Sequence, residues 1–321
     1  MEDSNNTAMI EVNGLTKYYG DFPAIEDINF TVGKGEVLGF LGPNGAGKTT
    51  VMRILTGFMP PTYGSVKIAG LDIVDDSLEA RRHIGYLPET VPLYTEMSVE
   101  DYLAFMGGIR GMNSKWLTRR VDDVIAICRL EEYQHTLIGK LSKGYKQRTG
   151  IAQAILHEPD VLIMDEPTVG IDPIQVVETR NLIKGFGGDQ TVILSTHILP
   201  EVSMVCSRVI IIHEGQVVAI DKPDNLSERL RATEKLEVDI RGPATEVMPA
   251  IRNMQGVLEV NRVDKEGVGV YLIETPHGSD IREEISSLVH EKGWGLLRLQ
   301  PIQMSLEEIF LRLTDMESGI K

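Results

Sequence analysis

The stretch GEVLGFLGPNGAGKTTVMRILTGF, residues 35–58, decides the fold of this chain. An apolar strand (Glu36 to Leu41) leads into a glycine-rich turn and then a helix, and the turn fits G-x-x-x-x-G-K-[ST] from Gly42 to Thr49. Glycines let successive backbone N–H groups turn inward around a β-phosphate, Lys48 adds a positive charge, and the Thr49 hydroxyl can bind Mg²⁺. Chance matches in this strand–turn–helix context are rare, so the stretch predicts a nucleotide site rather than a merely tight turn.

Strands and helices alternate on either side of this stretch. Residues 9–40 have apolar residues at alternating positions and read as strands, and after Pro159 the apolar runs VLIMDE, TVILST and RVIIIHEG alternate with helical segments. From about Glu89 to His157 the pattern is helical, which predicts an inserted subdomain between the first and second core strands. Apolar strands that alternate with helices are typical of a mostly parallel, buried sheet, so we expect an α/β fold.

The composition excludes some classes of protein. The chain has 321 residues, 42% of them hydrophobic, which is enough for about two domains. Its 32 basic and 47 acidic residues give a net charge of −15, whereas binding nucleic acid needs clustered Lys and Arg. The N-terminus does not resemble a secretory signal, and no apolar window of about 18 residues predicts a transmembrane helix. Cys128 and Cys206 are expected to be reduced, packed thiols of a cytosolic protein.

Acidic and basic side chains follow two of the apolar strands. Asp165 and Glu166 end the run VLIMDE, where open α/β sheets bind ligands. Asp165 is placed to hold Mg²⁺ through water, and Glu166 to polarise an attacking water as a general base. The alternative is that two acids merely end and solubilise a strand. His197, after the strand TVIL, can donate to a γ-phosphate.

A second candidate anion site lies in LSKGYKQR, residues 141–148. Ser142 is a natural N-cap for the helical run that follows, and the first turn of a helix has free N–H groups and a positive dipole end. The alternative is a capped surface helix with no ligand.

In this order, the motifs resemble those of the ATPase subunits of ATP-binding cassette (ABC) transporters, over roughly Met9 to Asn225. GPNGAGKTT resembles the Walker A motif, LSKGY the signature, VLIMDEP the Walker B motif and VGID (Val169 to Asp172) the D-loop. His197 matches the switch histidine, and Tyr19 matches the aromatic that stacks on adenine. The resemblance implies a P-loop ABC ATPase core with an antiparallel β subdomain and a helical subdomain.

The resemblance also implies a site for ATP and Mg²⁺ at the matching positions. Nucleotide contacts are implied for Tyr19, Gly42, Pro43, Asn44, Gly45, Ala46, Gly47, Lys48, Thr49, Thr50, Ser142, Gly144 and Asp172. Catalytic roles are implied for Lys48, Glu166 and His197, and Mg²⁺ contacts for Thr49, Glu89 and Asp165. In this family ATP binds between two head-to-tail subunits, so Ser142 and Gly144 would serve the partner's γ-phosphate.

Two positions depart from the family pattern. The signature usually reads LSGGQ, but Lys143 replaces its first glycine and Tyr145 its glutamine. Glu89 stands in IGYLPE where the family usually has a glutamine that touches Mg²⁺. A carboxylate can also bind Mg²⁺ but adds negative charge beside the phosphates, so we expect coupling to survive with an altered Mg²⁺ dependence.

The composition shifts near residue 225 and indicates a second domain. We expect an ATPase domain at 9–225 with its helical subdomain at about 89–157, a linker at 226–235 and an accessory domain at 236–321. The accessory domain reads as strand 236–241, helix 244–254, strands 257–263 and 268–275, helix 280–292 and strand 294–300. This βαββαβ order is typical of a small ferredoxin-like α+β domain. Ser305 and Glu308 are spaced as the capping box of a terminal helix.

The sequences SKGYKQR, STHILPEV, GIDP and SLEEIFLRLT resemble the ATPases of ABC-2-type bacterial exporters, especially those associated with gliding motility. That resemblance implies an ATPase that drives a separate transmembrane permease subunit, pairs with a second copy as a homodimer, and lies peripherally on the inner face of the cell membrane. A soluble ABC ATPase acting on ribosomes or DNA ends, and an importer ATPase, remain alternatives. The single module and the acidic charge weigh against the first, and the βαββαβ domain weighs against the second.

Overall fold

The structure is a computed structural model that describes residues 8–225, 233–265, 268–276 and 278–302. The chain forms two compact units, Met1–Pro223 and Asp224–Lys321, which are described separately below. Among the residues in these ranges, none of the helices has both the length and the apolar character needed to cross a bilayer.

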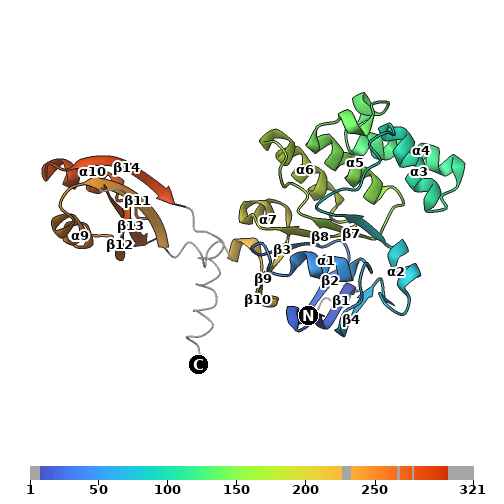
Figure 1. Ribbon diagram of the computed structural model, residues 1–321, viewed down its shortest axis with the longest axis horizontal. Helices are drawn as coiled ribbons and strands as arrows, with labels where there is room; N and C mark the ends of the chain where they lie inside the picture. Colours follow the sequence, from blue (N-terminus) through green and yellow to red (C-terminus); the bar gives the residue numbers. More distant parts are fainter. Residues whose placement is uncertain (1–7, 226–232, 266–267, 277, 303–321) are drawn as a thin grey trace, which may run out of the picture. The chain divides into compact units, whose positions relative to one another are not determined.

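A six-stranded sheet forms the centre of the first unit, with the strand order β10-β9-β3-β8-β7-β6 (Figure 1). Its strands are β3 (Val37–Leu41), β6 (Ile84–Leu87), β7 (Val161–Asp165), β8 (Thr191–Thr196), β9 (Arg208–His213) and β10 (Gln216–Asp221). The five strands from β9 to β6 pair in parallel, and β10 is antiparallel to β9 at one edge. Every residue of β3, β7 and β8 is buried, which explains their nearly continuous apolar sequences. The expected α/β fold is confirmed.

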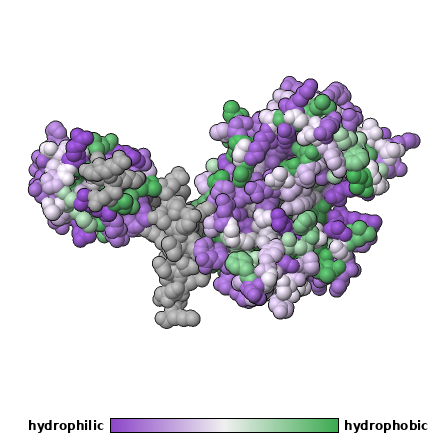
Figure 2. All heavy atoms as spheres, in the orientation of Figure 1, coloured by the Kyte–Doolittle hydropathy of each residue, from purple (hydrophilic) through white to green (hydrophobic). Residues whose placement is uncertain are grey.

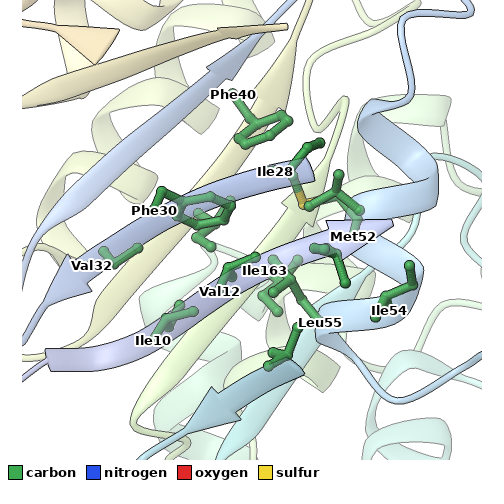
Figure 3. Packing of buried hydrophobic residues seen from close by; sticks show 14 of the residues in the cluster. Ile10, Val12, Ile28, Phe30, Val32, Phe40, Met52, Ile54, Leu55 and Ile163 are labelled. Carbon is green, nitrogen blue, oxygen red and sulfur yellow. The ribbon is translucent and has the colours of Figure 1, made fainter. Parts of the chain in front are cut away.

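A second, antiparallel sheet packs against this core. Its strand order is β2-β1-β4-β5, and its strands are β1 (Ala8–Tyr19), β2 (Phe22–Gly33), β4 (Tyr63–Ile68) and β5 (Leu71–Asp72). Figure 3 shows Phe30 of β2 facing Phe40 of β3, with ring centroids 5.7 Å apart, beside Met52 and Leu55 of the helix that follows the glycine-rich loop. The apolar face of this sheet therefore fixes the helix from which Lys48 projects.

Seven helices of the first unit lie within the described residues. They are α1 (Lys48–Leu55), α2 (Ser77–Arg82), α3 (Val99–Ile109), α4 (Ser114–Ile127), α5 (Lys143–Ile155), α6 (Pro173–Phe186) and α7 (Leu199–Val205), with 3₁₀ turns at Glu131–Tyr133 and Ile138–Lys140. Helices α3, α4 and α5 pack on one another as the helical subdomain (Figure 1). The N-cap side chains of these three helices, Ser98, Asn113 and Ser142, each accept a hydrogen bond from a backbone N–H.

A strand that the sequence analysis did not name precedes the helical insertion expected at about 89–157. β6 (Ile84–Leu87) lies between β3 and β7 in sequence and pairs in parallel with β7. The first helix of the subdomain then begins only at Val99. A four-residue strand such as IGYL is too short for its periodicity to separate it from a helix.

The two cysteines and the surface agree with the composition. Cys128 and Cys206 are buried free thiols, and burial raises the pKa of each to about 12. Such thiols pack as small apolar groups and are poor nucleophiles.

Figure 2 shows hydrophilic residues over most of the visible face, with hydrophobic residues in small separate groups.

The second unit is a four-stranded antiparallel sheet with the order β12-β13-β11-β14. Its elements follow one another as β11 (Thr233–Arg241), α9 (Ala244–Arg252), β12 (Glu259–Lys265), β13 (Val268–Pro276), α10 (Arg282–Glu291) and β14 (Gly295–Ile302). Apolar residues of both helices and of one sheet face make its own core, with Tyr271 fully buried. This order and pairing are those of a ferredoxin-like domain, as expected.

Two boundaries in this region require comment. Strand β11 begins at Thr233, so the last three residues assigned to a linker at 226–235 belong to the strand instead. A strand start rich in charge (TEK) has no apolar alternation by which the sequence could reveal it. The terminal helix expected at Ser305 lies outside the described residues.

His157 at the end of α5 gives a pH prediction for the first unit. Its Nε2 lies 3.0 Å from the Ile84 carbonyl oxygen, and its Nδ1 is buried without a hydrogen-bond partner. Burial, and secondarily the charge of Arg110, lowers the pKa of His157 from 6.5 to about 4. Between these pH values the unfolded chain binds the proton more tightly, so this unit loses stability as pH falls from about 6.5 to 4.

We expect His157→Gln, whose amide can keep the bond to Ile84, to lose less stability on acidification. The measurement is urea unfolding of wild type and variant at pH 7.5 and pH 5.0. The wild type should lose about 1 kcal/mol more than the variant over this interval, an amount reduced for partial exposure of the ring. Equal losses in the two proteins would contradict the assignment of a neutral, buried His157.

Candidate nucleotide-binding site

The glycine-rich loop joins β3 to α1 and needs glycine for two different reasons. Gly45 and Gly47 have φ angles of +82° and +105°, which side chains rarely allow. At Gly42 the reason is space, since a Cβ atom there would lie 2.3 Å from the carbonyl oxygen of Ile212 in β9. The loop is therefore held against the sheet with its backbone close to β9.

Lys48, the first residue of α1, is almost completely buried. Its ammonium donates to the carbonyl oxygens of Gly42 at 2.7 Å and Pro43 at 3.1 Å, and lies 3.3 Å from Oε1 of Glu166. An ammonium group has three donors, and these three acceptors match them. A buried charge is tolerated when it is paired and hydrogen-bonded in this way.

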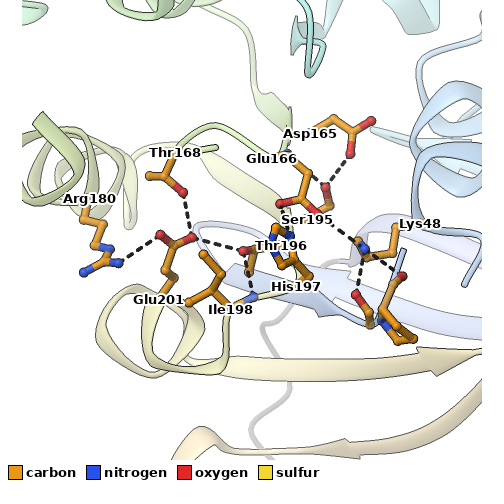
Figure 4. A network of polar contacts seen from close by, with 12 residues as sticks. Lys48, Asp165, Glu166, Thr168, Arg180, Ser195, Thr196, His197, Ile198 and Glu201 are labelled. Atoms are coloured by element: carbon orange, nitrogen blue, oxygen red, sulfur yellow. Dashed lines mark hydrogen bonds and ion pairs between the residues drawn. The ribbon is translucent and has the colours of Figure 1, made fainter. Parts of the chain in front are cut away.

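Glu166 connects the glycine-rich loop to His197. It follows β7 with a φ of +48°, a conformation that residues other than glycine adopt uncommonly and that clusters at functional sites. Its Oε1 faces Lys48, and its Oε2 lies 3.0 Å from Nδ1 of His197, which follows β8 (Figure 4). The structure thus brings all three expected catalytic residues, Lys48, Glu166 and His197, into one chain of contacts.

Ser195 of β8 holds the two acids at the end of β7. It is fully buried, and its hydroxyl donates to Oδ1 of Asp165 at 2.5 Å. The same Oγ accepts the backbone N–H of Glu166 at 3.1 Å. The parallel register, which places Asp165 opposite Ser195, makes these contacts possible. The sequence analysis did not single out Ser195, because the register between two strands cannot be read from the sequence of either strand.

A second buried network supports the loop after β7 (Figure 4). Oε2 of Glu201 in α7 accepts from the hydroxyl groups of Thr168 at 2.6 Å and Thr196 at 3.0 Å, and its Oε1 accepts from Arg180 of α6 at 2.9 Å. The Thr196 hydroxyl also accepts the backbone N–H of Ile198 at 3.1 Å. These bonds fix the strand end that carries His197 relative to the start of the D-loop.

An open cavity of about 290 Å³ lies over the glycine-rich loop. Its lining residues are Tyr19, Phe22, Ala24, Asn44, Gly45, Gly47, Lys48, Thr49, Thr50 and Glu166. Tyr19, 47% exposed, donates from its hydroxyl to Sδ of Met59 at 3.2 Å. Tyr19 and most residues of the glycine-rich loop, which were expected to bind nucleotide, therefore line one cavity. Phe22 and Ala24 also line it, and the sequence analysis did not name these two residues.

The signature residues do not line this cavity. Ser142 caps α5 by accepting the backbone N–H of Tyr145 at 3.4 Å, as its position predicts. A Cβ atom on Gly144 would lie 1.2 Å from Oε1 of Gln175, so the Gln175 amide occupies the place a side chain would take. The Asp172 carboxylate, expected at the nucleotide, caps α6 by accepting the backbone N–H groups of residues 174 and 175.

The oxygen ligands expected for Mg²⁺ are only partly gathered. Thr49 lines the cavity. The Asp165 carboxylate accepts a hydrogen bond from Ser195 through Oδ1, so Oδ2 is the oxygen that could bind a ligand. Glu89 is exposed beyond the end of β6. Over the residues that the structure describes, no cluster of three His, Cys, Asp or Glu side chains could hold a metal by itself. Hydroxyl and carboxylate oxygens suit Mg²⁺, which commonly takes few protein ligands and completes its shell with phosphate and water.

A buried parallel sheet, a glycine-rich loop that presents a lysine at a helix start, and a carboxylate facing that lysine define a P-loop nucleotide-binding protein. Residues 25–169 match the ABC transporter family. The bacitracin transport ATP-binding protein BcrA of Bacillus licheniformis is 32% identical over 309 residues, which cover 96% of this chain and 97% of that protein. This chain belongs to the ABC transporter family of ATP-binding proteins, and as such it binds and hydrolyses ATP.

Two further proteins extend the comparison. The Nod factor export ATP-binding protein I of Rhizobium sp. (strain N33) is 32% identical, over 96% of this chain and 97% of its own length. A solved dimeric structure of a bacterial ABC transporter cassette is 25% identical with a TM-score of 0.62, and the match covers 67% of this chain and 99% of that one.

The buried bond between Ser195 and Asp165 gives a stability prediction. Ser195→Ala leaves a buried carboxylate oxygen without its donor, so we expect the first unit to lose about 1–3 kcal/mol of unfolding free energy in urea. Ser203→Ala is a matched control, because the Ser203 hydroxyl is exposed and only donates back to the Leu199 carbonyl of α7. The control should stay within about 0.5 kcal/mol of wild type. Equal effects of the two substitutions would show that Ser195 does not support Asp165.

Proposed function

We propose that this protein is the ATP-hydrolysing subunit of an ABC-2-type exporter, and that it drives a separate transmembrane permease subunit. The observation that carries the proposal is the contact of one carboxylate, Glu166, with both Lys48 and His197 at the edge of the glycine-rich cavity. That arrangement supports roles for Glu166 as a base, Lys48 as a cation and His197 as a second proton donor toward a γ-phosphate.

Each of these residues has a role in the proposed reaction. Glu166 accepts a proton from the attacking water as the bond from the γ-phosphorus to the β–γ bridging oxygen breaks. Lys48 stabilises the charge on the phosphoryl oxygens. His197 already uses Nδ1 toward Glu166, so Nε2 is the nitrogen left for the γ-phosphate, and both contacts are donations only in the imidazolium form.

When bound, Mg²⁺ would supply charge neutralisation for the phosphate groups. Thr49 and Asp165 would hold it, and Glu89 would reach it when the loop after β6 closes on the site. Glu89 itself is exposed, so its side chain is free of close packing. Tyr19, which lines the same cavity, would stack on the adenine.

We propose further that two copies enclose two ATP molecules head to tail. Within the described residues, Ser142 and Gly144 lie outside the cavity that Lys48 lines, so one chain does not complete its own site. The backbone N–H groups at the start of α5 would instead bind the γ-phosphate in the partner copy. The likeness to a dimeric cassette supports this pairing.

The export direction rests on relatives rather than on the site. One relative of nearly the same length is named for Nod factor export and another for bacitracin transport. The ferredoxin-like second unit differs from the β-barrel domains common among importer ATPases, and the net charge of −15 disfavours a nucleic-acid target. We also propose a peripheral position on the inner face of the cell membrane, which the likeness to ATP-binding proteins of transport systems supports.

The Glu166→Gln variant tests the catalytic assignment. We expect it to bind ATP, to hydrolyse it roughly 10² to 10⁴ times more slowly, and to accumulate as a dimer in saturating ATP. Steady-state phosphate release and size-exclusion chromatography with light scattering measure the two effects. A strictly monomeric profile at saturating ATP would contradict the head-to-tail pairing, and undiminished hydrolysis would contradict the role of Glu166.

The membrane partner is tested by purification from the native cell. We expect the tagged chain, after gentle solubilisation of membranes, to retain a multi-helix membrane protein in stoichiometric amount. The Glu166→Gln variant treated with ATP is a useful parallel sample, since a closed dimer should retain the same partner. Recovery only from the aqueous fraction, with ribosomes or with no partner, would overturn the exporter proposal and leave the ATPase chemistry in place.

A further inference from the structure

Phe22 is an exposed aromatic residue at the mouth of the nucleotide cavity. It is 69% exposed and begins β2 directly after a tight turn at Gly20 and Asp21. The antiparallel register places Phe22 opposite Tyr19, the last residue of β1. Directly opposed residues project to the same face of a strand pair, so both aromatic side chains emerge at one end of the hairpin.

The backbone around Phe22 is restricted. Pro23 follows it, and a residue before proline is confined to extended conformations. Gly20, with a φ of +60°, makes the turn that closes the hairpin. The backbone at Phe22 is therefore restricted before any ligand arrives, which reduces the backbone entropy that a contact would cost.

Both residues line the cavity, and they differ in their polar and aromatic contacts within the described residues. The Tyr19 hydroxyl bonds to Met59, and its ring lies 5.9 Å from the Lys17 ammonium. For Phe22, the described residues provide no ring stacking and no cation partner. Single exposed apolar residues are common on protein surfaces. An exposed aromatic side chain that lines a cavity beside a phosphate-binding loop, however, is positioned to be covered by a bound nucleotide.

We propose that Phe22 is a second aromatic contact for the base of the nucleotide, acting together with Tyr19. The inference rests on the proposed placement of adenine against Tyr19. An aromatic face contacts the π-face or edge of any purine, so Phe22 would add affinity without reading exocyclic groups. It would raise the affinity for the nucleotide and leave the chemistry at the γ-phosphate to Lys48 and Glu166.

The experiment measures equilibrium binding of ATP, GTP and inorganic tripolyphosphate to the full chain by calorimetry, in the Glu166→Gln background to prevent turnover. We expect Phe22→Ala to weaken ATP and GTP binding roughly tenfold each, the lower part of the range for base–aromatic stacking, and to leave tripolyphosphate binding within about twofold of the parent. Phe22→Tyr should bind ATP as the parent does. In the wild-type background, Phe22→Ala should raise the KM for ATP and leave kcat within about twofold.

Tyr63→Ala is the matched control, because Tyr63 is also an aromatic of the antiparallel sheet, is 67% exposed and lies outside the cavity. It should not change any of the affinities. An unchanged ATP affinity in Phe22→Ala would overturn the proposal, and so would an equal loss of ATP and tripolyphosphate binding, which would place the effect at the phosphate loop.

Failure of the proposed placement of the nucleotide against Lys48 and Tyr19 gives a different result. In that case Lys48→Ala and Tyr19→Ala would leave ATP binding intact, whatever Phe22→Ala does. Loss of ATP binding in those two variants together with normal binding in Phe22→Ala would refute the role of Phe22 alone.

Discussion

The ion pair between Lys48 and Glu166 is the interaction on which the site depends. Both groups are nearly inaccessible to solvent, and either charge left alone in that position would cost several kcal/mol. The pair joins the start of α1, which the glycine-rich loop connects to β3, with the residue that follows β7, and β8 lies between these two strands in the sheet. It therefore requires the sheet order, the glycine-rich loop and the buried strands to be correct at the same time.

The same pair places Glu166 between two groups that can be positive. One carboxylate oxygen faces Lys48 and the other faces His197, so the position of this carboxylate is fixed from both sides. A phosphate that reaches Lys48 competes with Glu166 for the ammonium, which would leave the carboxylate to act on a water molecule. The left-handed backbone at Glu166 aims its side chain into this position, and Ser195 holds the adjoining peptide.

Local patterns predicted the parts of the fold that the chain encodes locally. The glycine-rich turn, the buried strand runs, the Ser142 cap and the βαββαβ order could all be read from residues adjacent in sequence. Contacts that depend on strand register could not be predicted from the sequence. Ser195 meets Asp165, and Phe22 stands opposite Tyr19, only because of how strands pair, and the four residues of β6 were too few to show a period.

The departures from the usual signature have a structural counterpart in the neighbouring loop. Lys143 replaces a glycine, and its ammonium lies so close to Gly170 that a Cβ atom there would be 2.1 Å from it. Gly170 has a φ of +73°, so this position favours glycine for two reasons. One residue along, the Gln175 amide fills the space over Gly144. The start of α5 therefore packs against both Gly170 and the first turn of α6. The long Lys143 side chain fits there because Gly170 has no side chain.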